Sequence, residues 1–352
     1  MSSNLLNIKN FGQAVWIDNL SRNLINSGNL KQLIDIDGIV GVTSNPTIFH
    51  KAISNDISYQ NDLVSLKNSL LSLEERYEVL VIPDIQKACD LLANIYHTSK
   101  YVDGYVSFEV APHLAHNVRL TIENAKRLWN TVNRPNLMIK IPATPAGLEA
   151  FEELTSEGIN VNITLIFSLN QLVNVWTSYI NGLSRRVHSG KPIDNIKAVA
   201  SFFISRIDTA IDKELPQHLQ GKTAISLSKV AYAKYNDIFG GEKFNNLKPA
   251  GAMPQFLLFA STGTKNPQYS DVLYIEELIG KNTINTVPDA TLAAFRDHGI
   301  ARNSLIEDIE TAQATLQEIN NIVDLNKLGE QLQIDGLILF EDSFNSLLEL
   351  MK

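Results

Sequence analysis

The chain has 352 residues, of which 44% are hydrophobic and 19% are charged, and its formal net charge is −8. This composition is typical of a globular protein, and the length allows either two domains or one large α/β barrel. The acidic balance argues against nucleic acid and membranes as partners, and the single cysteine, Cys89, excludes a disulfide framework and favours a reducing, cytoplasmic location.

Short apolar segments with the character of strands alternate with longer amphipathic segments. In chain order, the expected strands are residues 14–20, 38–44, 104–110, 137–143, 160–168, 197–204, 255–261 and 282–288. The amphipathic segments between them include residues 117–132, 146–158 and 170–187. This alternation indicates parallel strands joined by helices, and eight strands favour a (β/α)8 TIM barrel, an α/β fold, over an open doubly wound sheet. We expect one barrel domain over residues 1–352, with extra helices in 45–103 and C-terminal helices in 303–352.

Alternation of side chains within five of the expected strands separates an apolar face from a polar one. In residues 137–142, Leu137, Ile139 and Ile141 share one face, and Lys140 lies on the other. The same parity gives four further strands a face that carries Asp18, Thr43, Asn45, Glu109, Asn162 and Thr164. In a barrel this second face points inward, and the carboxyl ends of the strands form the site. The sequence therefore predicts that these side chains converge on one mouth.

A lysine amine in a desolvated site is a nucleophile that forms Schiff bases with ketones and aldehydes. Asp18 and Glu109 would supply the acid and base that this chemistry needs, and Thr164 could orient water. A structural ion-pair network is the alternative, but it has no need of the amides and hydroxyls as well. Helix capping is a second alternative, which applies to Asp18, Thr43 and Asn45.

Two cations follow the sixth and seventh expected strands. Arg206 comes directly after the sixth, while Ser261 and Lys265 come after the seventh. Because barrel enzymes often bind phosphate in the loops after their last strands, we expect a phosphate site here, with solvated loop charges as the alternative. His113 and His116 form a conceivable ligand pair, but no third ligand is near in sequence, so no metal is predicted.

Two segments resemble the transaldolase family. These are GVTSNPTIF (41–49) and the run from MIKIPAT (138–144) to GINVNITLIFS (158–168), and the match extends over essentially the whole chain. The segments FASTGTKNPQYSD (259–271) and TINTVPDATL (283–292) resemble the longer form of the family. The resemblance implies a (β/α)8 barrel that transfers a dihydroxyacetone unit between sugar phosphates without a cofactor. In the pentose phosphate pathway, this converts sedoheptulose 7-phosphate and glyceraldehyde 3-phosphate to erythrose 4-phosphate and fructose 6-phosphate.

The resemblance also implies roles for single residues. Lys140 resembles the Schiff-base lysine, Asp18 the acid/base at the C4 hydroxyl, and Glu109 with Thr164 the pair that handles the catalytic water. The residues that resemble substrate contacts are Thr43, Asn45, Asn162, Ser201, Phe203, Arg206 and Ser261. Shorter family members have an arginine where Gly263 stands, and here Lys265 follows it instead.

Two other functions compete with transfer. A related fructose 6-phosphate aldolase releases free dihydroxyacetone and has an amide in place of the water-handling carboxylate, so Glu109 favours the transferase, as does Phe203. A non-catalytic barrel that binds a sugar phosphate would have no use for Lys140 beside two carboxylates. The oligomeric state is left open, and a homodimer is among the assemblies that the sequence allows.

Overall fold

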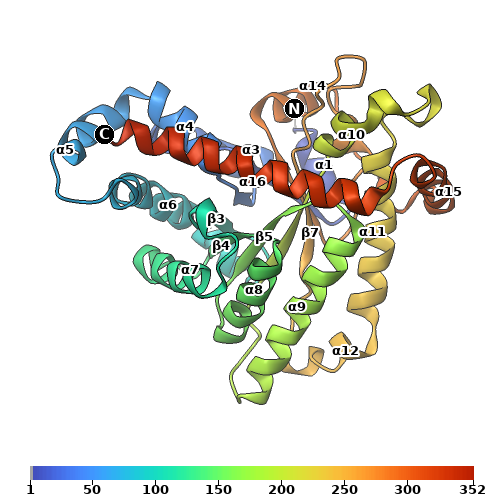
Figure 1. Cartoon of the computed structure of the whole chain (residues 1–352), viewed down its shortest axis with the longest axis horizontal. Coiled ribbons are helices and arrows are strands. Elements are labelled where there is room, and N and C mark those ends of the chain that lie inside the picture. Colours follow the sequence, from blue (N-terminus) through green and yellow to red (C-terminus); the bar gives the residue numbers. More distant parts are fainter. Residues whose placement is uncertain (1–2) are drawn as a thin grey trace.

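Eight parallel strands close into a barrel in the order of the chain in the computed structural model, which describes residues 3–352 (Figure 1). They are β1 (Gln13–Ile17), β2 (Gly41–Val42), β3 (Tyr105–Glu109), β4 (Leu137–Pro142), β5 (Val161–Ile166), β6 (Ala198–Phe203), β7 (Phe256–Ala260) and β8 (Thr283–Val287). Seven of them lie within an expected strand, β1 begins one residue before its expected range, and each is shorter than expected. The predicted barrel is confirmed.

Helices surround the barrel, and further helices lie before β1 and after the last β/α unit. The α-helices are α1 (Leu5–Lys9), α2 (Arg22–Asn26), α3 (Asn29–Asp37), α4 (Pro46–Asn55), α5 (Gln60–Lys67), α6 (Leu73–Thr98), α7 (Val118–Val132), α8 (Pro145–Glu157), α9 (Leu169–His188), α10 (Ser205–Ile211), α11 (Thr223–Gly240), α12 (Glu242–Asn245), α13 (Leu273–Glu276), α14 (Asp289–His298), α15 (Ile309–Asn320) and α16 (Leu325–Leu350). Short 3-10 helices are η1 (Ile57–Tyr59), η2 (Pro112–Leu114), η3 (Asp212–Glu214), η4 (Gln217–Leu219), η5 (Lys248–Ala250) and η6 (Ser304–Ile306). Helices α4–α6 thus lie within residues 45–103, and α15 and α16 lie within 303–352.

The barrel interior is filled by large side chains at its centre. Trp16 is fully buried, and its ring stacks on that of Tyr105 with centroids 6.5 Å apart. Gly41 faces them on β2, where a Cβ atom would lie 2.3 Å from the indole ring, so only glycine fits. This apolar layer separates the polar side chains at the carboxyl end of the barrel from the buried Lys197 at its amino end.

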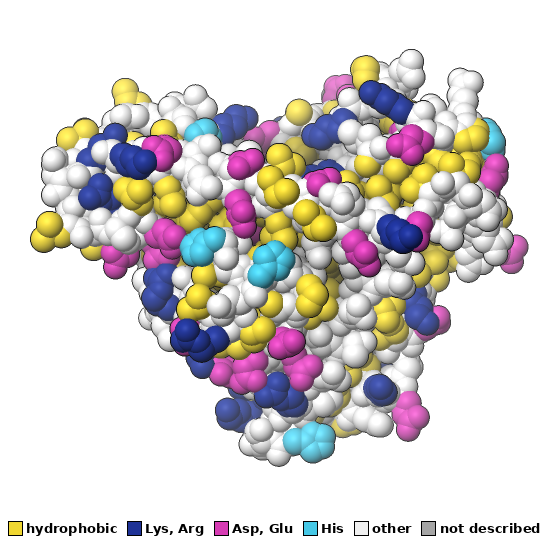
Figure 2. All heavy atoms as spheres, in the orientation of Figure 1, with side chains coloured by type: hydrophobic (Ala, Val, Ile, Leu, Met, Phe, Trp, Pro, Cys, Tyr) yellow, Lys and Arg dark blue, Asp and Glu magenta, His cyan; other side chains and the backbone are white. Residues whose placement is uncertain are grey.

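The C-terminal helix α16 crosses the barrel over the carboxyl ends of its strands, seen as the red helix that spans Figure 1 from α15 to the region of α4. Its residue Gln333 hydrogen-bonds to backbone carbonyls just past β4 and near the end of β5. On the face seen in Figure 2, acidic and basic side chains are interspersed over the surface. Within residues 3–352, no helix has the length and apolar character needed to cross a membrane.

Candidate active site

Lys140 lies at the centre of the candidate site, on β4. The lysine is 5% exposed, and its Nζ donates to the carbonyl oxygen of Ser44 at 3.2 Å and to Glu109 Oε2 at 3.3 Å. The ring of Phe340, on α16, covers the ammonium with its centroid 5.4 Å from Nζ. Strand pairing sets Lys140 beside Glu109 on one side and Asn162 on the other. The parity predicted for these strands is confirmed.

Glu109 is the only carboxylate in contact with that amine among the described residues, and it is 7% exposed. Burial raises the pKa of the Glu109 carboxyl above its ordinary value, and the attraction of Lys140 opposes the rise. Its second oxygen, Oε1, is buried without a hydrogen-bond partner among residues 3–352. A carboxyl with a raised pKa can hold a proton nearer to neutral pH, which suits proton exchange with an adjacent amine.

Asp18 follows β1 directly and lies at the mouth of the barrel, partly exposed. Its Oδ1 accepts a hydrogen bond from Thr43 Oγ1 at 2.7 Å, and that hydroxyl also lies 2.6 Å from Thr286 Oγ1. Burial raises the pKa of Asp18, while the bond from Thr43 and the charge of Lys140 oppose the rise. The capping alternative for Asp18 is wrong, because Ser21 caps α2 by accepting from the Leu24 amide.

Replacing Asp18 by asparagine should stabilise the protein at pH 7. The folded state raises the pKa of Asp18, so it holds this proton more tightly than the unfolded chain, and stability is lost as the pH rises through the folded pKa. Asp18→Asn removes the free-energy cost of burying a charged carboxylate and keeps an oxygen that accepts from Thr43. We expect a gain of about 1 kcal/mol in the free energy of unfolding at pH 7, which disappears near pH 4. Urea unfolding at pH 7 and pH 4 measures the free energy of unfolding of both proteins. An equal decrease at both pH values in the variant would contradict the prediction.

The side-chain amide of Asn45 has one atom that caps a helix and one that is available to a ligand. It is the N-cap of α4, and its Oδ1 accepts from the Ile48 amide at 3.0 Å, which confirms the capping alternative. The cap uses the oxygen alone, so the Nδ2 group is the part that can donate to a bound molecule. Thr43, by contrast, does not cap this helix and binds Asp18 instead.

A buried polar row continues across β5 and β6. Asn162 is fully buried, donates to Ser107 Oγ at 3.0 Å and accepts from Ser201 Oγ at 2.6 Å. These bonds fix the rotamer of the amide and leave one of its N–H groups free to donate. Thr164 lies two residues further along β5, also fully buried, and its Oγ1 has no hydrogen-bond partner among residues 3–352. Unpaired buried oxygens are rare enough to suggest a ligand or water.

The residues expected to bind phosphate lie at the ends of β6 and β7. Arg206, in the first turn of α10, has its guanidinium carbon 5.2 Å from the ring centre of Phe203, and burial lowers the pKa of this guanidinium. Ser261 adopts a left-handed conformation with φ 57°, and its hydroxyl lies 3.0 Å from that of Ser205. Lys265 is exposed in the loop beyond. Arg206 has no ion-pair partner among the described residues, so its charge is free for an anion.

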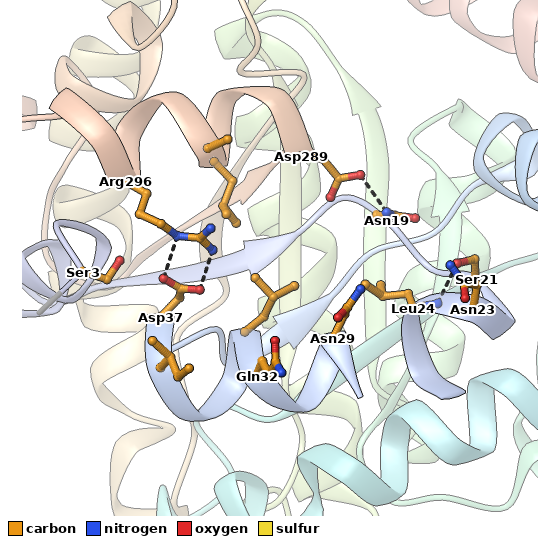
Figure 3. A pocket seen from close by; sticks show the side chains of 14 residues that line it. Ser3, Asn19, Ser21, Asn23, Leu24, Asn29, Gln32, Asp37, Asp289 and Arg296 are labelled. Carbon is orange, nitrogen blue, oxygen red and sulfur yellow. Dashed lines mark hydrogen bonds and ion pairs between the residues drawn. The ribbon is translucent and has the colours of Figure 1, made fainter. Parts of the chain in front are cut away.

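Two grooves border the site on the outside of the barrel. One, of about 740 Å3, runs between α3 and α14, with the ion pair of Asp37 and Arg296 at one end and the hydrogen bond from Asn19 to Asp289 at the other (Figure 3). The second, of about 750 Å3, shares Asn19 and Asp289 and is also lined by Asp18. The second groove therefore reaches Asp18 from the surface.

Several groups in the site were not predicted. Ser107 lies on the inward face that alternation gives to residues 105–110, but no role was predicted for it, and Thr286 follows the same rule in the eighth strand. The Ser44 carbonyl and Phe340 carry no such signal, because one contact is made by the backbone and the other by a distant helix. Gln333 and Ser205 also lie outside the strands. Within residues 3–352, no group of three or more His, Cys, Asp or Glu could hold a metal ion.

Comparisons with known proteins show the family to which the chain belongs. The family model described as Transaldolase/Fructose-6-phosphate aldolase matches residues 15–351. A transaldolase of Thiobacillus denitrificans is 48% identical over 349 residues, covering 97% of each chain, and one of Neisseria gonorrhoeae is 46% identical over 345 residues, covering 98% of each. A relative named Transaldolase 2 from Nostoc sp. is 42% identical over 365 aligned residues, covering 98% of this chain and 96% of its own. The chain belongs to the transaldolase and fructose-6-phosphate aldolase family.

Proposed function

We propose that the chain catalyses the transaldolase reaction and that Lys140 forms the Schiff base. The enzyme moves a dihydroxyacetone unit between sugar phosphates, converting sedoheptulose 7-phosphate and glyceraldehyde 3-phosphate to erythrose 4-phosphate and fructose 6-phosphate. The observation that carries the proposal is the buried contact of Lys140 Nζ with Glu109 at 3.3 Å, in a barrel mouth that Asp18 also faces. An apolar barrel would gain from packing a hydrophobic residue there, so the pair favours chemistry over stability.

In the first half of the reaction, Lys140 binds the ketose covalently and Asp18 acts as the base. Lys140 passes a proton to Glu109 and its amine attacks the C2 carbonyl of the ketose; the resulting hydroxyl then leaves as water with a proton returned by Glu109, which gives a protonated imine. Asp18 removes the proton of the C4 hydroxyl, the bond between C3 and C4 breaks, and its electrons flow into the imine to leave an enamine. The aldose departs with its new aldehyde. The acceptor aldose then reverses these steps, and its aldehyde oxygen regains the proton from Asp18.

Water must leave and return at C2, and we assign these steps to Glu109 and Thr164. Their strands flank β4, where Glu109 pairs with Lys140 and Thr164 pairs with Pro142, two residues beyond the lysine. Each also has a buried oxygen without a partner among residues 3–352, Glu109 Oε1 and Thr164 Oγ1. Such atoms support binding of a reactant water. The raised pKa of Glu109 suits it to take and return the proton.

The phosphate of the substrate would bind to Arg206, with Ser261 and Lys265 as further contacts. Replacing Arg206 by methionine should raise the KM for fructose 6-phosphate by about 10-fold to 100-fold, because a charge-assisted, bidentate contact is lost. Lys265→Met should raise it less, because that lysine is exposed and screened by solvent. Initial rates against substrate concentration measure both. Equal KM values for Arg206→Met and the unmodified enzyme would remove Arg206 from the phosphate site.

Transfer and simple cleavage are separated by the fate of the three-carbon unit. With labelled fructose 6-phosphate and an added aldose phosphate acceptor, we expect the label in a new ketose phosphate rather than in free dihydroxyacetone. A carboxylate at position 109, which is placed to handle the water, supports the transferase. Label that appears chiefly in free dihydroxyacetone, with acceptor present, would identify an aldolase instead.

The same proposal covers partners and location. Sugar phosphates are the substrates, and a cytoplasmic location is supported by the presence of a single cysteine, Cys89, which leaves no disulfide pair within the chain. A homodimer is part of the proposal, and size-exclusion chromatography with light scattering tests it. A mass of one chain at micromolar concentration would exclude the dimer.

A further inference from the structure

The backbone of β5 is irregular next to Thr164. Leu165 adopts a left-handed conformation with φ 59°, which costs free energy for any residue with a side chain. The pairing with β6 shifts register between Ile163 and Ile166, so one extra residue is accommodated on β5. Such a bulge reorients neighbouring side chains and persists only when its surroundings hold it. Its position matters here because Thr164 carries the unpaired hydroxyl of the site.

One side chain of α16 holds this irregular segment. Gln333 Nε2 donates one hydrogen to the carbonyl oxygen of Leu165 at 2.9 Å and the other to that of Ala143 at 3.0 Å. The two carbonyls belong to neighbouring chain segments, which are also joined directly because the Ala143 amide donates to the Thr164 carbonyl at 2.7 Å. The glutamine therefore bridges the segment after Lys140 and the bulge after Thr164.

The helix that carries Gln333 is itself held close to the barrel. A Cβ on Gly336 would lie 2.9 Å from Leu165 Cδ2, and one on Gly329 would lie 2.7 Å from Ser168 Cβ, so α16 approaches the barrel where it has no side chain. Between these glycines, Gln333 faces the strand ends. One turn beyond Gly336, the ring of Phe340 lies over the Lys140 amine. The close contacts at Gly329 and Gly336, on either side of Gln333 along the helix, thus fix the position of its side-chain amide.

We propose that Gln333 is a positioning residue for the reaction: by fixing the Leu165 bulge to the end of β4, it holds the Thr164 hydroxyl in register with the Lys140 amine. The inference rests on the proposed function, in which Thr164 handles the water that leaves and returns at the imine carbon. The glutamine does not touch the reacting atoms. It acts through its hydrogen bonds to the carbonyls of Ala143 and Leu165, and Leu165 directly follows Thr164.

The test compares Gln333→Met with Gln331→Met. Methionine matches glutamine in length but donates no hydrogen bond. Gln331 lies on the same helix and is exposed, and its side chain donates to Asp335 Oδ1 at 2.8 Å. We expect Gln333→Met to lower kcat for transfer by about 10-fold with KM within about twofold, since small misplacement of a reacting group has effects of this size. Gln331→Met should match the unmodified enzyme. Equal kcat values for the two variants would overturn the proposal.

A double-variant cycle asks whether Gln333 acts through Thr164. In a Thr164→Val background, the hydroxyl is already absent, so adding Gln333→Met should change kcat by less than about twofold. A further 10-fold fall in that background would show that the glutamine acts on something else and would contradict the proposal. Measuring KM alongside kcat separates this effect from a general loosening of the substrate site.

Hydrogen exchange of the Ala143 amide tests the bridge independently of the reaction. In Gln333→Met this amide should exchange at least about 10-fold faster than in Gln331→Met, because its bond to Thr164 loses the adjacent support. Unchanged exchange would mean that the bulge holds itself, against the proposal. If the unmodified enzyme formed no Schiff base, the proposed function would fail, while this exchange measurement would still decide whether Gln333 holds the two segments.

Discussion

Replacing Lys140 by methionine should lower the transfer rate by at least about 10^4-fold, because the covalent intermediate can no longer form. Methionine is close to lysine in length and is apolar, so it suits a position that is 5% exposed between Phe340 and the strand ends. Removing the amine leaves Glu109 without its counter-charge. The raised pKa of this carboxyl allows it to protonate, so we expect the folded state to survive. Circular dichroism and steady-state rates measure both effects.

Lys197 offers a matched control at the opposite end of the barrel. It directly precedes β6, is 1% exposed, and has a pKa that burial lowers to about 7. Its Nζ lies 3.2 Å from the ring centre of Phe256 and does not face the mouth. Lys197→Met should keep transfer within about threefold of the unmodified enzyme, since desolvation without carboxylate partners near a substrate gives no catalysis. Loss of transfer in a folded Lys197→Met, with Lys140→Met active, would reverse the assignment.

Replacing Glu109 by glutamine should lower the transfer rate by about 10^2-fold to 10^3-fold, within the range for loss of a general acid or base. Glutamine keeps the shape of the side chain and the contact with Lys140 but cannot exchange a proton. We also expect a larger share of the three-carbon unit to be released as free dihydroxyacetone. Product analysis by chromatography, with an acceptor present, measures rate and partition together.

The control for this change is a second pair of lysine and glutamate outside the barrel. Glu157 pairs with Lys126 at 2.6 Å on partly exposed helices, so Glu157→Gln removes a similar ion pair without touching the mouth. It should leave both rate and partition unchanged, because such surface pairs contribute little. A Glu109→Gln enzyme that transfers as fast as Glu157→Gln would exclude Glu109 from the chemistry.

The strands and their inward faces could be predicted because a barrel imposes a period of two on both of its surfaces. The outer face must be apolar to pack under helices, so a polar residue such as Lys140 or Asn162 stands out at once. This reasoning located Asp18 and Glu109 as well. It could not separate capping from function, since Asn45 caps α4 with one atom and leaves another free.

The part of the site that α16 contributes could not be predicted from local sequence patterns. Phe340 and Gln333 lie more than 160 residues from the β4 and β5 residues that they contact, and a helix with apolar and polar faces does not say where it packs. The bulge at Leu165 was likewise invisible, because leucine gives no hint of a left-handed conformation. Both features depend on tertiary contacts, in which distant chain segments compensate a local cost.

The most direct test of the account is to trap the intermediate. The enzyme is mixed with fructose 6-phosphate, reduced with borohydride, digested and analysed by mass spectrometry, with Lys140→Met and Lys197→Met treated in the same way. We predict one stable adduct, on the peptide that contains Lys140, in the unmodified enzyme and in Lys197→Met, and none in Lys140→Met. An adduct on another lysine, or an undiminished adduct in Lys140→Met, would contradict the assignment of Lys140 as the Schiff-base residue.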